Sequence, residues 1–184
     1  GQGHPCFIVA EVGNNHQGSM DNARRMIHEA AQAGADAVKF QKRHLESLLT
    51  RAGREAPYTG PNSFGPTYGA HRLALELSAG QMGELKALAE SLGLVFFASA
   101  WDDVSLGEML DLDVELMKVC SADLVNLPLL RRVAASRLPV ILSTGMSSLE
   151  EIDAALAVVR SQHEDIVLLH CNSSYPCKEE QIGL

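Results

Sequence analysis

The chain has 184 residues, a hydrophobic content of 46% and a formal net charge of −8. That length suits one domain with a substantial core, and the acidic balance argues against a nucleic-acid partner because nothing resembles a basic stripe. No apolar run approaches the roughly 18 residues of a membrane span, and the N-terminus lacks the layout of a signal peptide. The four cysteines show neither CxxC spacing nor the density of a disulfide scaffold, so we expect a protein of the reducing cytoplasm.

The first predicted strand covers residues 7–12, an apolar run that carries Glu11 near its end. Gly13 breaks the run, and a polar turn leads to Ser19, a good N-cap for a helix that Gly34 is placed to end. A carboxylate at the C-terminal end of a buried parallel strand is where α/β folds build their sites. On this stretch alone, a functional carboxylate and a plain strand with a polar turn are equally good interpretations.

A second strand is predicted over residues 37–41, with Lys39 and Gln41 on one face because side chains alternate along a strand. The periodicity then fails from residue 44 to about residue 72, where prolines and glycines punctuate a stretch with several aromatic residues. A loop this long inside a compact domain is usually a lid or a binding loop. Disorder is the alternative, and the aromatic residues weigh against it.

Four further strands are predicted after this stretch, and a helix is expected after each of them except the last. The strands lie at residues 95–100, 116–121, 139–144 and 166–171. The helix after the 139–144 strand can be capped by Ser147 with Glu150 or by Ser148 with Glu151. All six strands are near-continuous apolar runs, as parallel strands covered on both faces should be.

Polar groups recur at the carboxyl ends of the six strands, which favours the mouth of a (β/α)8 TIM barrel. They are Glu11; Lys39 and Gln41; Ser99 and Asp102; Lys118, Ser121 and Asp123; Ser143 and Thr144; and Ser173 and Tyr175. A doubly wound open sheet is the rival architecture, but the glycine-rich phosphate fingerprint after the first strand is missing. Because a barrel needs eight strands, we expect the first six strands to be present and the last two to be missing from this chain.

Two lysines on different strands, each flanked by hydroxyl or amide side chains, suit a ligand that carries a phosphate and a carboxylate. Lys39 and Lys118 have an alternative interpretation as snorkelling side chains at strand ends, but charged residues are unusual inside such apolar strands. Glu11 and Asp123 are the complementary carboxylates, fit for proton transfer, metal-bound water or sugar hydroxyls.

Four side chains near the strand ends have plain structural interpretations. His16 is compatible with a turn histidine, and we expect His170 to be a buried histidine with its hydrogen bonds satisfied. Cys120 and Cys171 sit in apolar runs, where a free cysteine behaves as a small buried hydrophobe.

Six segments together resemble the sialic acid synthase family, the N-acetylneuraminate synthases and their relatives. The segments are Ala-Glu-Val-Gly-Asn-Asn-His-Gln-Gly (10–18), Gly-Ala-Asp-Ala-Val-Lys-Phe-Gln (34–41), Tyr-Thr-Gly-Pro-Asn-Ser-Phe-Gly-Pro-Thr-Tyr-Gly (58–69), Met-Lys-Val-Cys-Ser-Ala-Asp (117–123), Leu-Ser-Thr-Gly-Met (142–146) and Leu-His-Cys-Asn-Ser-Ser-Tyr-Pro (169–176). They run the whole length of the chain in order, so the set is specific although each piece alone is weak.

The resemblance implies an enzyme that condenses phosphoenolpyruvate with N-acetylmannosamine or its 6-phosphate. The products would be a sialic acid or its 9-phosphate, together with inorganic phosphate. A divalent metal, Mn2+ or Mg2+, would assist. The family's metal-binding histidines lie on the last two barrel strands, so no metal ligand is named in this chain. The resemblance also implies small-molecule substrates, a homodimer for the complete protein, and neither a membrane nor a nucleic-acid partner.

Carried over residue by residue, the resemblance assigns roles to ten positions. Glu11 matches the catalytic acidic residue beside the metal and the reacting carbons, while Asp123 and Tyr175 match positions near the amino sugar. The positions that match phosphoenolpyruvate contacts are Lys39, Gln41, Ser99, Lys118, Ser121, Ser143 and Ser173. The chain departs from the family at Cys120 and Ala122, where glycine is common, so added side chains are expected to crowd the ligand's approach. The family's C-terminal antifreeze-like domain is expected to be absent.

Two other functions stay open. One is a Schiff-base aldolase on the same fold, with Lys39 or Lys118 as a nucleophile whose pKa is lowered by burial. The other is a non-catalytic, truncated product that binds partners or merely folds. We expect the 184-residue chain alone to be inactive as a synthase, and sticky because its first and sixth strands would be open edges.

Overall fold

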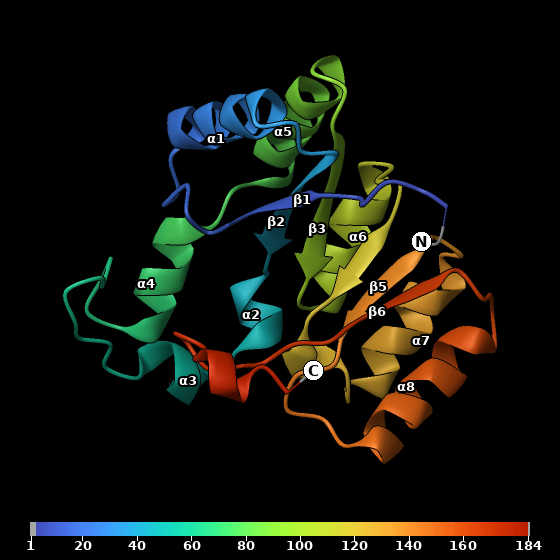
Figure 1. The fold of residues 1–184 in the computed structure, drawn as a ribbon. Helices are drawn as coiled ribbons and strands as arrows, with labels where there is room; N and C mark the ends of the chain where they lie inside the picture. The colour runs from blue at the N-terminus through green and yellow to red at the C-terminus, as the bar shows by residue number, and fades with distance from the viewer. Residues whose placement is uncertain (1–2, 184) are drawn as a thin grey trace. The chain divides into compact units, whose positions relative to one another are not determined.

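The computed structural model describes residues 3–183, which form two compact units. The first unit runs to Glu115 and the second begins at Leu116. Strands and helices alternate along the chain in both units (Figure 1), and every strand pairing described within a unit is parallel. The fold is therefore α/β, as the sequence predicts. That these strands belong to a (β/α)8 barrel whose last two strands are missing stays a prediction, as does the absence of an antifreeze-like domain.

The first unit holds three parallel strands with β2 in the middle. They are β1 (Val9–Gly13), β2 (Ala37–Lys42) and β3 (Val95–Ala100). The register places Glu11 opposite Lys39, and Gln41 opposite Ser99. Between Glu11 and Gly13 the pairing of β1 shifts, which is a local bulge at the end of the strand. Three neighbouring strands thus deliver the first predicted polar groups to one end of this sheet.

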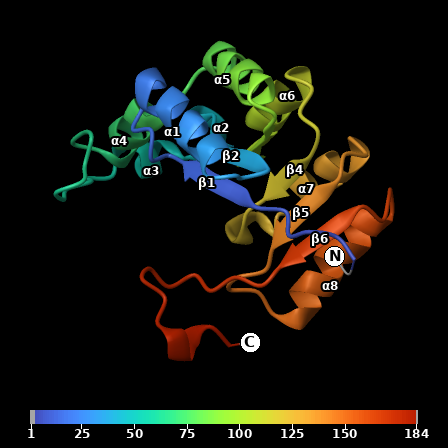
Figure 2. The same ribbon diagram turned by 45° about the horizontal axis from the view of Figure 1, so that its top comes forward.

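Side-chain caps begin the long helices of the first unit, and Ser19 is a cap among them that the sequence predicts. The long helices are α1 (Met20–Gln32), α5 (Ala79–Ser91) and α6 (Asp103–Asp111). Ser19 accepts a hydrogen bond from the Asn22 backbone N–H at the start of α1, and Asp102 does the same for Ser105 at the start of α6. The α1 and α5 helices lie side by side in both views (Figures 1 and 2). Phe40 and Phe96 stack at 5.2 Å between ring centroids in the core beneath them.

The stretch expected to be a loop from residue 44 to 72 contains three short helices. They are α2 (Leu45–Leu48), α3 (Arg51–Glu55) and α4 (Tyr68–Leu75). The buried His71 ring lies 4.4 Å from the Tyr58 ring centroid and accepts a hydrogen bond from the Phe64 backbone N–H through Nδ1. Aromatic stacking around one histidine orders the segment, so the expectation of an irregular loop is only partly correct. A lid or binding role for it stays a prediction.

The second unit holds three parallel strands with β5 in the middle. They are β4 (Met117–Val119), β5 (Val140–Ser143) and β6 (Ile166–Leu169). The helices of this unit are α7 (Leu127–Ala135) and α8 (Leu149–Arg160), and its short 3-10 turns are η1 (Ser121–Asp123) and η2 (Glu179–Gln181). Ser148 and Glu151 form the capping box of α8, which decides between the two pairs that the sequence allows. The core of the second unit includes the fully buried Leu130 and Leu142.

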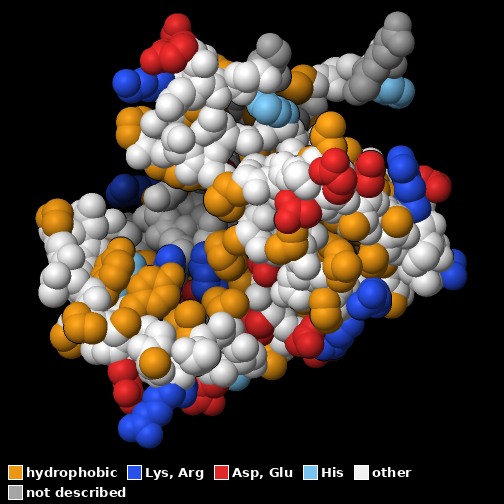
Figure 3. Space-filling model, turned by 90° about the horizontal axis from the view of Figure 1, so that it is seen from below, with side chains coloured by type: hydrophobic (Ala, Val, Ile, Leu, Met, Phe, Trp, Pro, Cys, Tyr) orange, Lys and Arg blue, Asp and Glu red, His pale blue; other side chains and the backbone are white. Residues whose placement is uncertain are grey.

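Strand β6 is more exposed than the sequence predicts. Val167, Leu168 and Leu169 are 53%, 44% and 38% exposed, so this strand is not covered on both faces. The expectation that His170 is buried is wrong, because His170 is exposed and its Nε2 lies 2.6 Å from the Ile182 carbonyl oxygen. Cys171 is likewise only partly buried. Figure 3 shows one face of the molecule, on which hydrophobic side chains lie exposed among acidic and basic ones.

Candidate functional site

The first group of predicted site residues gathers around the ammonium of Lys39. Its Nζ lies 2.5 Å from Glu11 Oε2 and donates a hydrogen bond to Ser99 Oγ at 3.3 Å. The three side chains come from β1, β2 and β3, and Lys39 is only 8% exposed. A snorkelling lysine would extend its charge into water, whereas this charge is held inside by a carboxylate and a hydroxyl. The geometry therefore disfavours the snorkelling interpretation for Lys39.

Gln41 belongs to the same group, because its amide and the Glu11 carboxylate both lie close to Gly13. A Cβ atom added to Gly13 would lie 2.9 Å from Glu11 Oε1 and 3.5 Å from Gln41 Nε2, so both side chains crowd this position. The backbone of Gly13 also has a φ of +53°, which glycine adopts without strain. Glycine is thus required here both for its backbone conformation and for the room it leaves to two predicted site residues.

A buried arginine that the sequence interpretation missed holds the other end of Gln41. Arg43 Nη2 donates a hydrogen bond to Gln41 Oε1, and Arg43 Nη1 contacts Asn14 Oδ1 and Glu76 Oε1, each at 3.4 Å. The guanidinium also stacks on the Trp101 ring at 4.2 Å. A charged residue directly after an apolar strand was the only signal in the sequence, and nothing local connects it with a residue 33 positions away.

Desolvation by burial shifts the ionisation of this arginine and its carboxylate partner in opposite directions. It lowers the pKa of Arg43 and raises the pKa of Glu76, and the attraction between the two charges opposes both shifts. The two side chains are 4% and 9% exposed. A buried pair of this kind is retained only where further hydrogen bonds satisfy both groups, as Gln41 and Asn14 do for the guanidinium.

The second group lies in the second unit, around Lys118. This lysine is 7% exposed, and its Nζ donates to Ser143 Oγ and to the Val119 carbonyl oxygen, both at 2.7 Å. Nearby, Ser121 Oγ accepts a hydrogen bond from the Gly145 backbone N–H at 3.1 Å. The predicted cation and two of the predicted hydroxyls therefore come from the ends of β4 and β5.

Gly145 is the point at which this group is most crowded. A Cβ atom there would lie 2.6 Å from Ser173 Oγ and 3.0 Å from Ser121 Oγ, closer than real Cβ atoms approach in the first case. Ser173 follows β6 and is exposed, and its hydroxyl lies against the same glycine as that of Ser121. Glycine directly after the fifth predicted strand thus leaves room for both hydroxyls.

The predicted amino-sugar residues are only partly brought together. Asp123 is buried, with Cys120 Sγ donating to its Oδ2 at 3.0 Å and Asn126 Nδ2 contacting its Oδ1 at 3.4 Å. Burial, reinforced by Asp123, raises the pKa of the Cys120 thiol to about 12, so it stays protonated and can donate. Tyr175 is 95% exposed. The added side chain of Cys120 thus turns its sulfur toward Asp123, and the expected crowding of a ligand stays a prediction.

His16 has a structural role in the turn between β1 and α1. Its ring is 1% exposed and Nδ1 accepts a hydrogen bond from the Gly18 backbone N–H at 3.1 Å. Burial lowers the pKa of His16, because the charged imidazolium would lose its hydration there. The interpretation of His16 as a turn histidine is consistent with this geometry.

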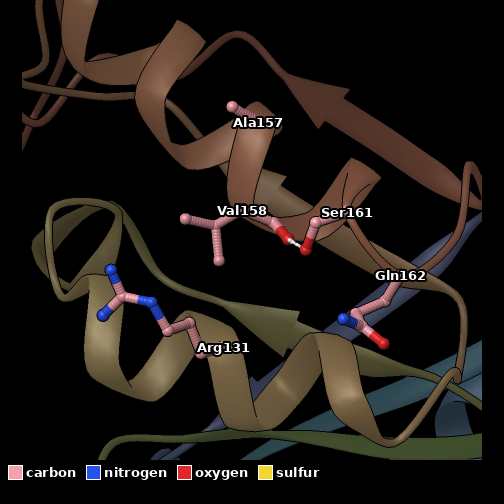
Figure 4. A pocket seen from close by; sticks show the side chains of 5 residues that line it. All are labelled: Arg131, Ala157, Val158, Ser161 and Gln162. Atoms are coloured by element: carbon pink, nitrogen blue, oxygen red, sulfur yellow. Dashed lines mark hydrogen bonds between the residues drawn. The ribbon is translucent and has the colours of Figure 1, made fainter.

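Hollows on the surface of the described residues include one beside a predicted site residue. One of about 460 Å³ lies beside β1 and is lined by Glu11, Asn15, Arg25 and Glu29 among others. The other, of about 420 Å³, lies between α7 and α8 and is lined by Arg131, Ala157, Val158, Ser161 and Gln162 (Figure 4). Only the first includes a predicted site residue.

The described residues contain neither a metal-binding cluster nor a membrane-spanning helix. Among residues 3–183, no three His, Cys, Asp or Glu side chains lie close enough together to hold a metal ion. Within the same part of the chain, no helix has both the length and the apolar character needed to cross a membrane.

Comparisons with known proteins converge on one family. The model of the NeuB family matches residues 26–184. The chain is 41% identical over 181 residues to N-acetylneuraminate-9-phosphate synthase of Homo sapiens, an alignment that covers 98% of this chain and 50% of that protein. It is 36% identical over 190 residues to N,N'-diacetyllegionaminic acid synthase of Legionella pneumophila, covering all of this chain and 53% of that one.

A solved structure agrees with these relatives. The N-acetylneuraminic acid (sialic acid) synthetase from Leptospira borgpetersenii, crystallised in complex with citrate, superposes with a TM-score of 0.83 at 35% identity. The match covers 98% of this chain and 59% of that one. The chain thus spans about half the length of the curated relatives it matches.

Proposed function

Because this chain belongs to the NeuB family, the sialic acid synthases and their relatives, we propose that the protein carrying it condenses phosphoenolpyruvate with an N-acetylated amino sugar. The sugar would be N-acetylmannosamine or its 6-phosphate, and the products a sialic acid or its 9-phosphate and inorganic phosphate. The relatives are named as synthases of such sugar acids, which supports this class of reaction.

The observation that carries the proposal is the pair of buried lysines, each bound to a serine hydroxyl. Lys39 with Ser99 and Lys118 with Ser143 supply positive charge and oriented hydrogen bonds, as a phosphate and a carboxylate require. In a chain of net charge −8, an anionic ligand is repelled by the molecule as a whole. Each desolvated ammonium group can offset that repulsion in its own surroundings, since it acts in a medium of low dielectric constant.

Glu11 is the group that we assign to proton transfer. It already contacts the Lys39 ammonium, and its side chain is 49% exposed to solvent, so it can reach a ligand held by that lysine. An incoming anion would compete with Glu11 for Lys39 and free the carboxylate to accept a proton from water or from a sugar hydroxyl. The proposal includes a divalent metal, Mn2+ or Mg2+, in the complete protein, but the described residues do not form a metal site and no step is assigned to one.

The Schiff-base aldolase is the second candidate, and the geometry at Lys39 disfavours it. A Schiff-base lysine must reach its carbonyl as a neutral amine. Glu11 at 2.5 Å and the Ser99 hydroxyl instead stabilise the ammonium of Lys39. Borohydride treatment in the presence of pyruvate separates the two mechanisms, because only the aldolase leaves a covalent adduct on the lysine.

The decisive experiment measures phosphate release from phosphoenolpyruvate by the complete protein that carries this chain. We expect release that depends on an N-acetylated amino sugar, with N-acetylmannosamine and its 6-phosphate tested in parallel. In Lys39→Ala the Michaelis constant for phosphoenolpyruvate should rise about ten- to a hundredfold, since one charge-assisted contact is lost. Phosphate release that is independent of any amino sugar, or unchanged kinetics in Lys39→Ala, would refute the proposal.

A further inference from the structure

The side-chain amide of Gln41 is held in one orientation by the buried guanidinium of Arg43. An amide carries an acceptor oxygen and a donor nitrogen at its two corners, whereas a guanidinium has donors only. Arg43 Nη2 can therefore bond only to Gln41 Oε1, as it does. The amide nitrogen Nε2 then lies 3.5 Å from the Cβ position of Gly13, a position that is 2.9 Å from Glu11 Oε1.

The arginine is itself fixed from three sides, so that its own position is determined before any ligand binds. Glu76 Oε1 and Oε2 bind its guanidinium and its backbone N–H at 3.4 and 3.1 Å, Asn14 contacts Nη1, and Trp101 stacks on the plane. A lysine at this position would have no planar fork of donors to satisfy these partners and Gln41 together. The contacts with Glu76, Asn14 and Trp101 thus leave the guanidinium little freedom to move.

We propose that Arg43 is a positioning residue that presents the N–H donors of Gln41 to an anionic ligand in the site. The inference rests on the proposed function for the identity of that ligand, phosphoenolpyruvate. An amide free to rotate would present its oxygen to the anion part of the time, and that orientation would be repulsive. Holding the amide in advance removes this penalty from binding, which is the general benefit of preorganisation.

A double-mutant cycle in the complete protein tests the coupling. Arg43→Met should weaken phosphoenolpyruvate binding about tenfold when Gln41 is present, and less than about twofold in the Gln41→Ala background. Lys42→Met is the matched control, because Lys42 is also buried and ion-paired, with Glu108 at 3.1 Å. This control should lower stability without changing the affinity. An Arg43→Met effect of equal size in both backgrounds would show that Arg43 only stabilises the fold and does not act through Gln41, and would overturn the inference.

The second measurement does not depend on ligand binding. In protein labelled with 15N-glutamine, the side-chain amide signal of Gln41 should move in Arg43→Met and stay in place in Lys42→Met. An unmoved signal in Arg43→Met overturns the positioning role even if phosphoenolpyruvate binds as proposed. A moved signal with no phosphoenolpyruvate binding to the unmutated protein supports the positioning role and refutes the proposed substrate. If Arg43→Met does not fold, Arg43→Lys replaces it, since it keeps the charge beside Glu76 and should give the same shifted signal and weakened binding.

Discussion

At the scale of single residues, Glu11 is placed both to hold Lys39 and to transfer a proton to or from a ligand. Its carboxylate contacts the Lys39 ammonium and is about half-exposed. Glu11→Gln keeps the shape and removes the charge, so turnover of the complete protein should fall by roughly 10²–10⁴ while it stays folded. Glu29→Gln is the control, because Glu29 lines the same hollow and has no assigned role. Turnover within about threefold of the unmutated protein, or a Glu11→Gln variant that misfolds, would contradict the assignment.

His16 is a second single residue with a testable effect, because its ionisation couples the free energy of unfolding to pH. Because burial lowers its pKa below the ordinary 6.5, the unfolded chain binds a proton at pH values where the folded chain does not. The stability that its neutral form contributes is complete above about pH 6.5 and declines as the pH falls toward the lower folded pKa. The free energy of unfolding in urea should therefore drop less between pH 7.5 and pH 5 in His16→Asn than in the unmutated chain, while the exposed His28→Asn should leave the drop unchanged. Equal drops in all three proteins would refute this role.

At the scale of elements, the structure selects one of two equivalent caps for α8. Ser148 Oγ accepts from the Glu151 backbone N–H at 3.3 Å, and Glu151 Oε2 accepts from the Ser148 backbone N–H at 2.7 Å. Ser148→Ala should lower the free energy of unfolding by about 1 kcal/mol, whereas Ser147→Ala should change it by only a few tenths of that. Urea denaturation of both variants measures the difference. Equal losses would show that Ser148 is not the dominant cap, and a larger loss in Ser147→Ala would show that the other pair caps the helix.

At the scale of the whole molecule, the exposed apolar side chains of β6 predict self-association. Val167 and Leu168 are 53% and 44% exposed on a strand whose backbone is ready to pair. The mass of the 184-residue chain in sedimentation should therefore rise with concentration, and Val167→Lys should reduce that rise. Val125→Lys is the matched control, since Val125 is 54% exposed but lies outside the strands. A single monomeric mass at every concentration would contradict the prediction.

Much of the fold and part of the site follow from the sequence by itself. The apolar runs placed all six strands, Ser19 and Ser148 cap the helices they precede, and the family was evident from six segments. These signals are local, because strand alternation and helix capping involve residues within a few positions of one another. Strand-end chemistry followed from the same patterns, since parallel strands deliver their carboxyl ends to one edge of a sheet.

Only the tertiary structure decided which of those groups meet and which are covered. Glu11 pairs with Lys39 because strand register places them opposite each other, and Arg43 reaches Glu76 across 33 residues of sequence. The same reason explains the errors at His170 and in β6, whose apolar sequence indicated burial although nothing described covers it. Apolar character states what a residue favours, but burial, ion pairing and amide orientation depend on neighbours brought from distant parts of the chain.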